Sequence, residues 1–301
     1  MKAVVIVSGK TVEGLQLKEV AQPVPRANEV LIKVQASSVC RGDINLRRIP
    51  KIILVPLGLL FGFKPMKIPG VEYAGVVETV GGSVTRFKPG DAVFGTATGL
   101  AFGGNAEYLC VPEKRKLGVI SLKPDTLSFE QAAVLPVGGM TAVQNLKRLA
   151  LRQGSRLLVY GASGSVGSYA VQLGRHYGAE VTAVCSTANQ KLAADLGAQR
   201  VLDYTKAGWQ AEAGQYDAVF DAVGKLSGAD KKQLLAGGGK YSSIKAPTSE
   251  VQAELDFLAG LAAAGQLKPL IDRSYPLEQT AEAHAYVEGK HKRGNVVIEV
   301  A

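Results

Sequence analysis

The clearest chemical pattern in the sequence is formed by three glycines, Gly161, Gly164 and Gly167. They follow the apolar run Arg156–Tyr160, which predicts a buried strand, and they open the segment Ser165–Tyr177, whose apolar residues recur at helical spacing. Small residues let a chain turn sharply from strand to helix and let its backbone approach a diphosphate at the positive end of the helix dipole. Because strand, glycines and helix come in the required order, the pattern favours dinucleotide binding over a plain tight turn.

The residues after the next predicted strand, Glu180–Val184, indicate which dinucleotide binds. In an NAD site this strand usually ends in Asp or Glu, whose carboxylate accepts a hydrogen bond from the ribose 2′-hydroxyl. This chain has Ser186 and Lys191 in that region, with no carboxylate between them. A hydroxyl and an ammonium suit a 2′-phosphate, so the sequence favours NADPH. The alternative is that Lys191 is only a solvated helix residue.

The composition is that of a globular protein. The 301 residues are 47% apolar and 20% charged, which excludes a disordered chain and gives enough length for about two domains. The chain carries a net charge of +9, but its Lys and Arg are scattered and lack interleaved aromatic residues, so we expect no nucleic-acid partner. Cys40, Cys110 and Cys185 form no Cys-x-x-Cys pair, which argues against a disulfide framework. The N-terminus lacks the apolar core of a signal peptide, so we expect a cytoplasmic protein.

Two kinds of pattern divide the chain. Over roughly the first 120 residues, short alternating segments such as Val30–Ala36 are separated by Pro-Gly and Gly-Gly turns, which is typical of a small β domain. From about residue 125 helices and strands alternate, which predicts a parallel sheet covered by helices on both faces. We therefore predict an α/β protein with a β domain of residues 1–122, completed by 268–301, and a dinucleotide-binding domain of residues 123–267.

The predicted parallel sheet has five strands. They are Arg156–Tyr160, Glu180–Val184, Arg200–Asp203, Asp217–Asp221 and Lys240–Ile244. A helix follows the fifth strand closely, because Ser249 and Gln252 predict a capping box at its start and Gly265 predicts its end. No room remains for a sixth strand, which the full doubly wound domain has.

The segment Ile52–Phe63 is almost wholly apolar and is flanked by basic residues. It is interrupted by Pro56 and falls well short of the roughly 20 apolar residues that a transmembrane helix needs. We therefore expect no transmembrane segment and a buried or pocket-lining loop. The alternative is a lid or anchor that contacts a membrane surface.

Further motifs extend the pattern over nearly the whole chain. They include Ala36–Val39 with Asp43, Ile68–Gly75, Phe87–Val93, Gly103–Tyr108, Leu135–Pro136 with Thr141, and Leu196–Ala198 with Tyr204. In this order they resemble the zinc-free quinone oxidoreductase (zeta-crystallin-like) branch of the medium-chain dehydrogenase/reductase superfamily. The resemblance implies a GroES-like β domain and a Rossmann domain, with NADPH in the cleft between them. The sixth Rossmann strand usually pairs across a dimer in this family, so we expect a monomer or an atypical homodimer here.

The resemblance also implies functional residues. Lys191 and Tyr204, together with Ser186, would hold the 2′-phosphate. The other cofactor-binding residues that it implies are Thr141, Gly161, Ala162, Ser163, Gly164, Ser165, Val166, Gly167, Gly224, Ser243, Ile244 and Asn295. It identifies no catalytic residue, and its candidates for the substrate pocket are Cys40, Asp43 and Asn45. Family members often have a tyrosine where this chain has Asn45.

The resemblance also bears on zinc, because related enzymes in the superfamily are zinc alcohol dehydrogenases. Cys40 stands where their first metal-binding cysteine would be. Their histidine position is Val71 here, and no cysteine occurs around Pro136–Met140. One thiolate and one carboxylate do not make a catalytic zinc site, which takes three protein ligands and a water. We therefore expect no metal.

An enzyme without a metal must transfer hydride to an acceptor that is already electron-poor. Quinones qualify, as do C=C bonds conjugated to a carbonyl, because the negative charge delocalises onto oxygen. The sequence therefore predicts a zinc-free, NADPH-dependent oxidoreductase that reduces a quinone or another small conjugated carbonyl compound. Two alternatives remain open. One is a reductase of α,β-unsaturated aldehydes or ketones with little quinone activity, and the other is a low-turnover protein that binds NADPH as a sensor or structural ligand.

Overall fold

The computed structural model describes residues 1–8, 11–49, 67–97, 103–114, 118–289 and 292–301. The chain divides into two compact units. The first unit comprises Met1–Val137, Glu250–Ala263 and Ile271–Ala301, and the second comprises Gly138–Ser249 and Ala264–Leu270. This division differs from the predicted one mainly in two segments that group with the first unit, residues 123–137 and Glu250–Ala263, the second of which contains the helix α9 (Gln252–Ala263). The side-chain nitrogen of Gln252, at the start of α9, donates to Ser121 Oγ of the first unit at 2.8 Å.

The second unit is built on a five-stranded parallel sheet in the order β10-β9-β8-β11-β12. The strands are β8 (Arg156–Tyr160), β9 (Glu180–Cys185), β10 (Arg200–Asp203), β11 (Tyr216–Asp221) and β12 (Leu235–Ser243). Leu157, Leu158 and Val159 of β8 are all fully buried, as expected for a central strand covered on both faces. The five-stranded Rossmann sheet predicted from the sequence is confirmed, whereas the oligomeric state stays a prediction.

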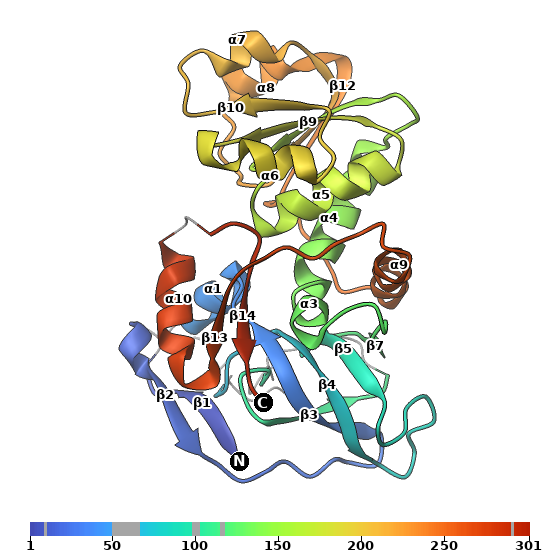
Figure 1. Ribbon diagram of the computed structural model, residues 1–301, viewed down its shortest axis with the longest axis vertical. Helices are drawn as coiled ribbons and strands as arrows, with labels where there is room; N and C mark the ends of the chain where they lie inside the picture. The colour runs from blue at the N-terminus through green and yellow to red at the C-terminus, as the bar shows by residue number, and fades with distance from the viewer. Residues whose placement is uncertain (9–10, 50–66, 98–102, 115–117, 290–291) are drawn as a thin grey trace. The chain divides into compact units, whose positions relative to one another are not determined.

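Helices cover both faces of this sheet. They are α4 (Pro136–Leu149, of which all but the first two residues belong to this unit), α5 (Ser165–His176), α6 (Gln190–Asp195), α7 (Trp209–Ala213) and α8 (Gly228–Leu234). Figure 1 shows α5 and α6 on one face of the sheet and α7 and α8 on the other. Helix α5 buries Tyr169, Ala170 and Leu173, which lie on the apolar side that its periodicity predicts.

The first unit is organised around a larger, mostly antiparallel sheet in the order β13-β14-β3-β4-β5-β7, with β6 also paired to β3. Its strands are β3 (Glu29–Ser38), β4 (Glu72–Val80), β5 (Ala92–Thr96), β6 (Tyr108–Pro112), β7 (Ile120–Leu122), β13 (Ile271–Pro276) and β14 (Asn295–Glu299). Strands β1 (Lys2–Ile6) and β2 (Leu15–Glu19) form a separate antiparallel pair. The helices among the described residues of this unit are α1 (Arg41–Arg47), α3 (Phe129–Ala133), α9 and α10 (Thr280–Glu288).

Strand β3 is central to the first unit. Its residues Ile32, Val34 and Ala36 are fully buried while Lys33 is exposed, as the alternating pattern predicts. One edge of β3 pairs with β4, and the other pairs first with β6 and then with β14. Strand β14, from the opposite end of the chain, therefore lies beside the last residues of β3.

The predicted capping box at Ser249 is wrong. Helix α9 begins at Gln252, and the Val251 carbonyl accepts from the Leu255 amide at 3.1 Å, which makes Val251 the capping residue. The backbone of Ser249 instead bonds the side chain of Gln144, through its amide at 3.0 Å and its carbonyl at 2.6 Å. Since these bonds satisfy Ser249, the helix starts later than its sequence pattern indicates.

No helix among the described residues is long and apolar enough to cross a membrane. The apolar segment Ile52–Phe63 lies outside the described residues, so its predicted loop or surface-anchor role is untested. The expected cytoplasmic location also stays a prediction.

Candidate functional site

The turn from β8 into α5 requires glycine at two positions. Gly161 has a φ of +83°, and a Cβ added there would lie 2.3 Å from a methyl carbon of Val223. A Cβ on Gly167 would lie 2.1 Å from the carbonyl oxygen of Gly161. The first turn of α5 therefore packs directly on the backbone that ends β8, as the sequence pattern predicts for a dinucleotide loop.

The N-terminus of α5 is open to an anion. Gly164 caps the helix and has no side chain to bind its first amides. A Cβ there would meet one atom within 4 Å, the Gly161 carbonyl oxygen at 3.4 Å, so there is room for a ligand to approach. The amides of Ser165 and Val166 and the positive end of the helix dipole suit a diphosphate. Helix α4, which carries Thr141, begins against this turn, because a Cβ on Gly138 would lie 2.8 Å from Ser165 Oγ.

Asn189 joins the glycine loop to the end of β9. The side-chain nitrogen of Asn189, Nδ2, donates to Ser163 Oγ at 3.2 Å and to Ser186 Oγ at 3.1 Å. Sequence reasoning named both serines but missed Asn189, although it lies in the same polar run, between Ser186 and Lys191. The side-chain oxygen of Asn189 is buried and has no hydrogen-bond partner among the described residues. It can accept a hydrogen bond from a ligand hydroxyl.

The predicted phosphate-binding lysine has another partner in this structure. Lys191 Nζ contacts Asp195 Oδ2 at 2.8 Å, one helical turn away, and its side chain is 87% exposed. Tyr204 is also exposed, and its ring lies 6.0 Å from that of Tyr160, which stacks on Trp209. Within the described part of the chain no contact joins Lys191 to Ser186 or Tyr204. Because an exposed ion pair contributes roughly 1 kcal/mol or less, a phosphate can displace Asp195.

Asp221 organises the loop after β11. Its side chain is fully buried and accepts hydrogen bonds from the amides of Val223, Gly224 and Leu226 at 3.0, 2.7 and 2.8 Å. This loop places Gly224 at the carboxyl end of β11, and Ser243 lies at the same end of the neighbouring strand β12. Ligands of open parallel sheets bind outside the carboxyl ends of the strands. Sequence reasoning missed Asp221, whose signal is a carboxylate at the last position of a buried strand.

Two other predicted cofactor residues, Ile244 and Asn295, are not part of the glycine loop or of the loop after β11. Ile244 follows β12, is exposed, and donates its amide to the Asp221 carbonyl at 3.1 Å. Asn295 belongs to the first unit, where it is buried at the start of β14.

The substrate-pocket candidates lie where β3 ends and α1 begins. Asp43 is fully buried, and its carboxylate accepts from the amides of Cys40, Gly70 and Val71 at 2.8, 3.2 and 3.1 Å. Burial raises the pKa of Asp43, and these amides oppose the shift. In this arrangement Asp43 holds the backbone together, while Asn45 is exposed on α1.

Glu72, which sequence reasoning did not single out as a site residue, lies beside this junction. One of its oxygens accepts from Ser38 Oγ at 2.5 Å and the other from the Val137 amide at 2.7 Å. Burial raises the pKa of Glu72 to about 7. Burial also raises the pKa of the Cys40 thiol, and the nearby Asp43 and Glu72 raise it further. Cys40 is therefore a neutral thiol at physiological pH.

The described residues contain no group of three His, Cys, Asp or Glu side chains that could hold a metal. His284 is fully buried in α10, and neither of its ring nitrogens has a hydrogen-bond partner in the described part of the protein. Burial lowers its pKa to about 3, so it stays neutral. His176 is exposed at the end of α5, and His291 lies outside the described residues.

Comparison with protein families matches three segments of the chain. Residues 26–123 match the alcohol dehydrogenase GroES-like domain, and residues 165–263 and 242–298 match two families described as zinc-binding dehydrogenase. The expected GroES-like and Rossmann domains are thereby confirmed.

Similar proteins cover nearly the whole chain. An NADPH-dependent alkenal/one oxidoreductase of Arabidopsis thaliana is 34% identical over 99% of this chain and 79% of its own length. A quinone oxidoreductase of Pongo abelii is 30% identical over 99% of this chain and 97% of its own. Among solved structures, a quinone oxidoreductase from Coxiella burnetii superposes with a TM-score of 0.83 at 26% identity, covering 100% of this chain and 99% of that one.

The packing at the glycine loop predicts a contrast between two substitutions. Gly167→Ala drives a methyl group into the Gly161 carbonyl, so it should destabilise the second unit by about 1–3 kcal/mol and weaken NADPH binding. Gly164→Ala meets no atom closer than 3.4 Å and should leave the melting temperature within about 2 °C of the parent. Thermal unfolding and NADPH fluorescence titration measure both effects. Equal melting temperatures for the two variants would show that the close approach of Gly167 to the Gly161 carbonyl does not require glycine at position 167.

The raised pKa of Glu72 predicts a pH-dependent stability. Its carboxyl group holds a proton more tightly in the folded chain, so its contribution to stability is complete below pH 4.5 and is lost as pH rises through about 7. Glu72→Gln keeps both hydrogen bonds, since an amide can accept from Val137 and donate to Ser38. The variant should match the parent at pH 4.5 and exceed its unfolding free energy by up to about 3 kcal/mol at pH 8.

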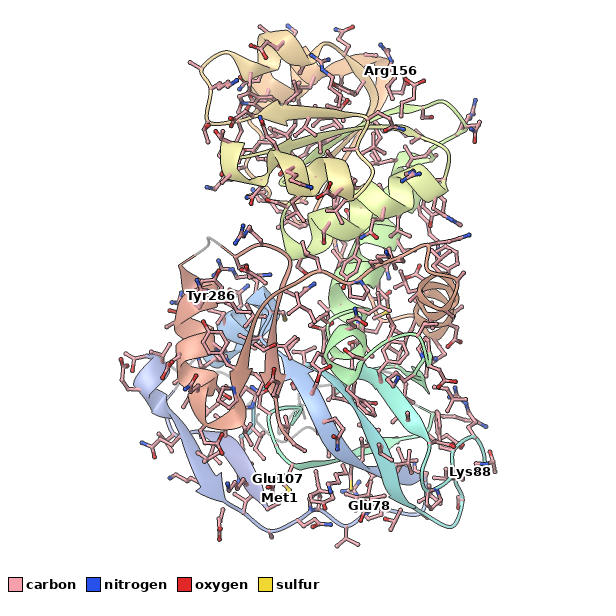
Figure 2. The ribbon with its side chains drawn as sticks, in the orientation of Figure 1. Met1, Glu78, Lys88, Glu107, Arg156 and Tyr286 are labelled. Carbon is pink, nitrogen blue, oxygen red and sulfur yellow. The ribbon has the colours of Figure 1, made fainter. Side chains whose placement is uncertain are left out.

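Denaturant unfolding at the two pH values measures this difference. The matched control is Glu78→Gln, an exposed position on the same strand that is labelled in Figure 2. If Glu72→Gln and Glu78→Gln change stability equally at both pH values, the buried carboxyl does not titrate as described.

Proposed function

Because the chain belongs to the quinone oxidoreductase and alkenal reductase branch of the medium-chain dehydrogenase/reductase superfamily, we propose that it is an NADPH-dependent reductase of conjugated carbonyl compounds. The observation that carries the proposal is the turn Gly161–Gly167. Its close backbone packing and a helix N-terminus whose cap, Gly164, has no side chain would form a cradle for a diphosphate. The names of the Arabidopsis and Pongo relatives support quinones, alkenals and alkenones as the substrate class.

The residues of the second unit fit NADPH, which supplies a hydride when bound. The amides at Ser165 and Val166 would bind the diphosphate, with Thr141 beside them. Asn189 and Ser186 would bind the adenosine ribose and its 2′-phosphate. Lys191 would leave Asp195 to add a charge-assisted hydrogen bond to that phosphate. Tyr204, Gly224, Ser243 and Ile244 complete the proposed set in this unit, and Asn295 of the first unit stays a prediction.

The donor groups around Cys40 do not fit zinc. A catalytic zinc takes three protein ligands, and among the described residues Cys40, Asp43 and Glu72 do not form a group of three side chains that could hold a metal. The oxygens of Asp43 and Glu72 already accept hydrogen bonds from backbone amides and from Ser38. The proposed reaction therefore needs acceptors that take hydride without a Lewis acid, which points to quinones and enones.

An acceptor panel tests the function. Mixed with NADPH, the protein should cause loss of absorbance at 340 nm when 1,4-benzoquinone or 4-hexen-3-one is added, and excess chelator should leave the rate unchanged. Simple saturated ketones should give no turnover, because they cannot delocalise the charge. NADPH binding without turnover of any acceptor would favour the sensor or structural alternative, and loss of activity on chelation would refute the zinc-free mechanism.

The cofactor preference has its own test. Lys191→Ala removes one charge-assisted bond to the 2′-phosphate, so kcat/KM for NADPH should fall about ten- to a hundred-fold while that for NADH stays nearly unchanged. Lys232→Ala, at an exposed position on α8, is the matched control and should change neither value. Equal losses with both cofactors in Lys191→Ala would show that Lys191 does not select NADPH.

A further inference from the structure

Strand pairing brings Lys292 to the substrate-pocket candidates. Strand β14 pairs with the end of β3 through Val297 and Ser38, and the Val39 amide donates to the Val296 carbonyl at 3.0 Å. The chain just before β14 therefore runs beside the junction that carries Cys40. Lys292 lies in this segment, more than two hundred residues from Cys40 in sequence.

Among the described residues, the ammonium group of Lys292 has one hydrogen-bond acceptor. It donates to the Gly294 carbonyl at 2.6 Å, which is its one hydrogen-bond partner among the described residues. An ammonium has three N–H donors, so the other two have no acceptor in the described part of the chain. Lys292 is half-buried, and it forms no ion pair within the described part of the chain.

The nearby carboxylates are occupied by other groups. Glu72 is bonded to Ser38 and Val137. Asp272 accepts from the hydroxyl of Tyr286 at 2.6 Å and from the Arg293 amide at 2.8 Å. Tyr286 lies on α10 and is labelled in Figure 2.

The charges around Lys292 act in opposite directions. Burial lowers the pKa of Lys292 and Arg41 lowers it further, while Cys40, Glu72 and Asp272 raise it, and the net direction is downward. A lowered pKa makes the ammonium a better proton donor near neutral pH. A half-buried cation that forms no ion pair with a described residue can also bind an oxygen that gains negative charge.

We infer that Lys292 is a catalytic residue that binds the carbonyl oxygen of the acceptor and donates a proton to it. The inference rests on the proposed function and adds to it the group that anchors the substrate oxygen. Of the sequence candidates for that task, Asp43 is committed to three backbone amides and Asn45 is exposed.

The step balances for an enone. The β-carbon receives hydride, with its two electrons, from the nicotinamide of NADPH. The π electrons of the C=C bond move to form a new double bond between the α-carbon and the carbonyl carbon, and the carbonyl π electrons move to oxygen. That oxygen takes a proton from Lys292 Nζ, which gives a neutral enol and a neutral amine. Water then reprotonates the amine, and the enol tautomerises to the saturated ketone.

If Lys292 donates the proton, its removal should affect kcat/KM differently for an enone and for a quinone. Hydride transfer to 1,4-benzoquinone creates an aromatic ring and needs less help from an acid, whereas an enolate from 4-hexen-3-one is a stronger base. Lys292→Met should therefore lower kcat/KM for 4-hexen-3-one by about a hundred-fold and that for 1,4-benzoquinone by less. Lys88→Met, at an exposed turn position labelled in Figure 2, is the matched control and should change neither.

The pH profile separates a proton donor from a structural residue. In the parent, kcat/KM for 4-hexen-3-one should fall as pH rises through the pKa of Lys292, measured independently by competitive labelling with acetic anhydride. Lys292→Arg keeps the positive charge at every pH used, so it should keep oxygen binding, lose this basic limb and have a lower kcat. Lys292→Met should lack the limb as well. NADPH affinity and the melting temperature check that both variants are folded.

The outcomes are distinguishable. A parent protein that turns over no acceptor would overturn the proposed function and this inference with it. Turnover by the parent together with an unchanged rate, or an unchanged basic limb, in Lys292→Met would overturn the role of Lys292 alone. A uniform loss with both acceptors and no change in the profile would likewise overturn it, because that result indicates altered packing.

Discussion

A carboxylate that is buried away from water must be given hydrogen-bond donors, and in this protein the backbone supplies most of them. Asp43 gathers three amides where β3 meets α1, and Asp221 gathers three in the loop after β11. Glu72 takes one amide and one hydroxyl. Each carboxylate fixes a loop at a strand end, and these loops carry the candidate site residues of both units. The geometry around the candidate residues of each unit therefore depends on buried carboxyl groups whose own role is to bind backbone amides and, for Glu72, a hydroxyl.

The same burial acts differently on each kind of group in the first unit. It raises the pKa of Glu72 and of the Cys40 thiol, and it lowers that of Lys292. Each shift favours the neutral form, as expected where water is scarce. Zinc relatives of this superfamily use a thiolate at the position of Cys40, and this chain instead places an ammonium nearby. In the proposed reaction Lys292 would supply the positive charge that a metal supplies in the zinc enzymes.

Local patterns predicted the second unit well because its elements are short, regular and formed by neighbouring residues. The strand Arg156–Tyr160 and the five-stranded sheet were predicted from alternation and spacing alone, whereas β12 begins at Leu235, before the predicted start at Lys240. The start of α9 was mispredicted because Gln144, distant in sequence, satisfies Ser249. Lys292 could not be identified, since only the pairing of β14 with β3 brings it to Cys40. Asp221 and Asn189 carried local signals that a closer reading of strand ends would have found.

The pairing of β14 with β3 also sets an order of events during synthesis. Most of the second unit is one continuous stretch, Gly138–Ser249, so it can fold soon after it leaves the ribosome. The first unit, although it is made first, must wait for residues 271–301 to complete its sheet. Until then the edge of β3 at Ser37 and Ser38 has no neighbour and is open to pairing with other chains. An exposed strand edge favours aggregation, so synthesis of β14 removes one such edge from the first unit.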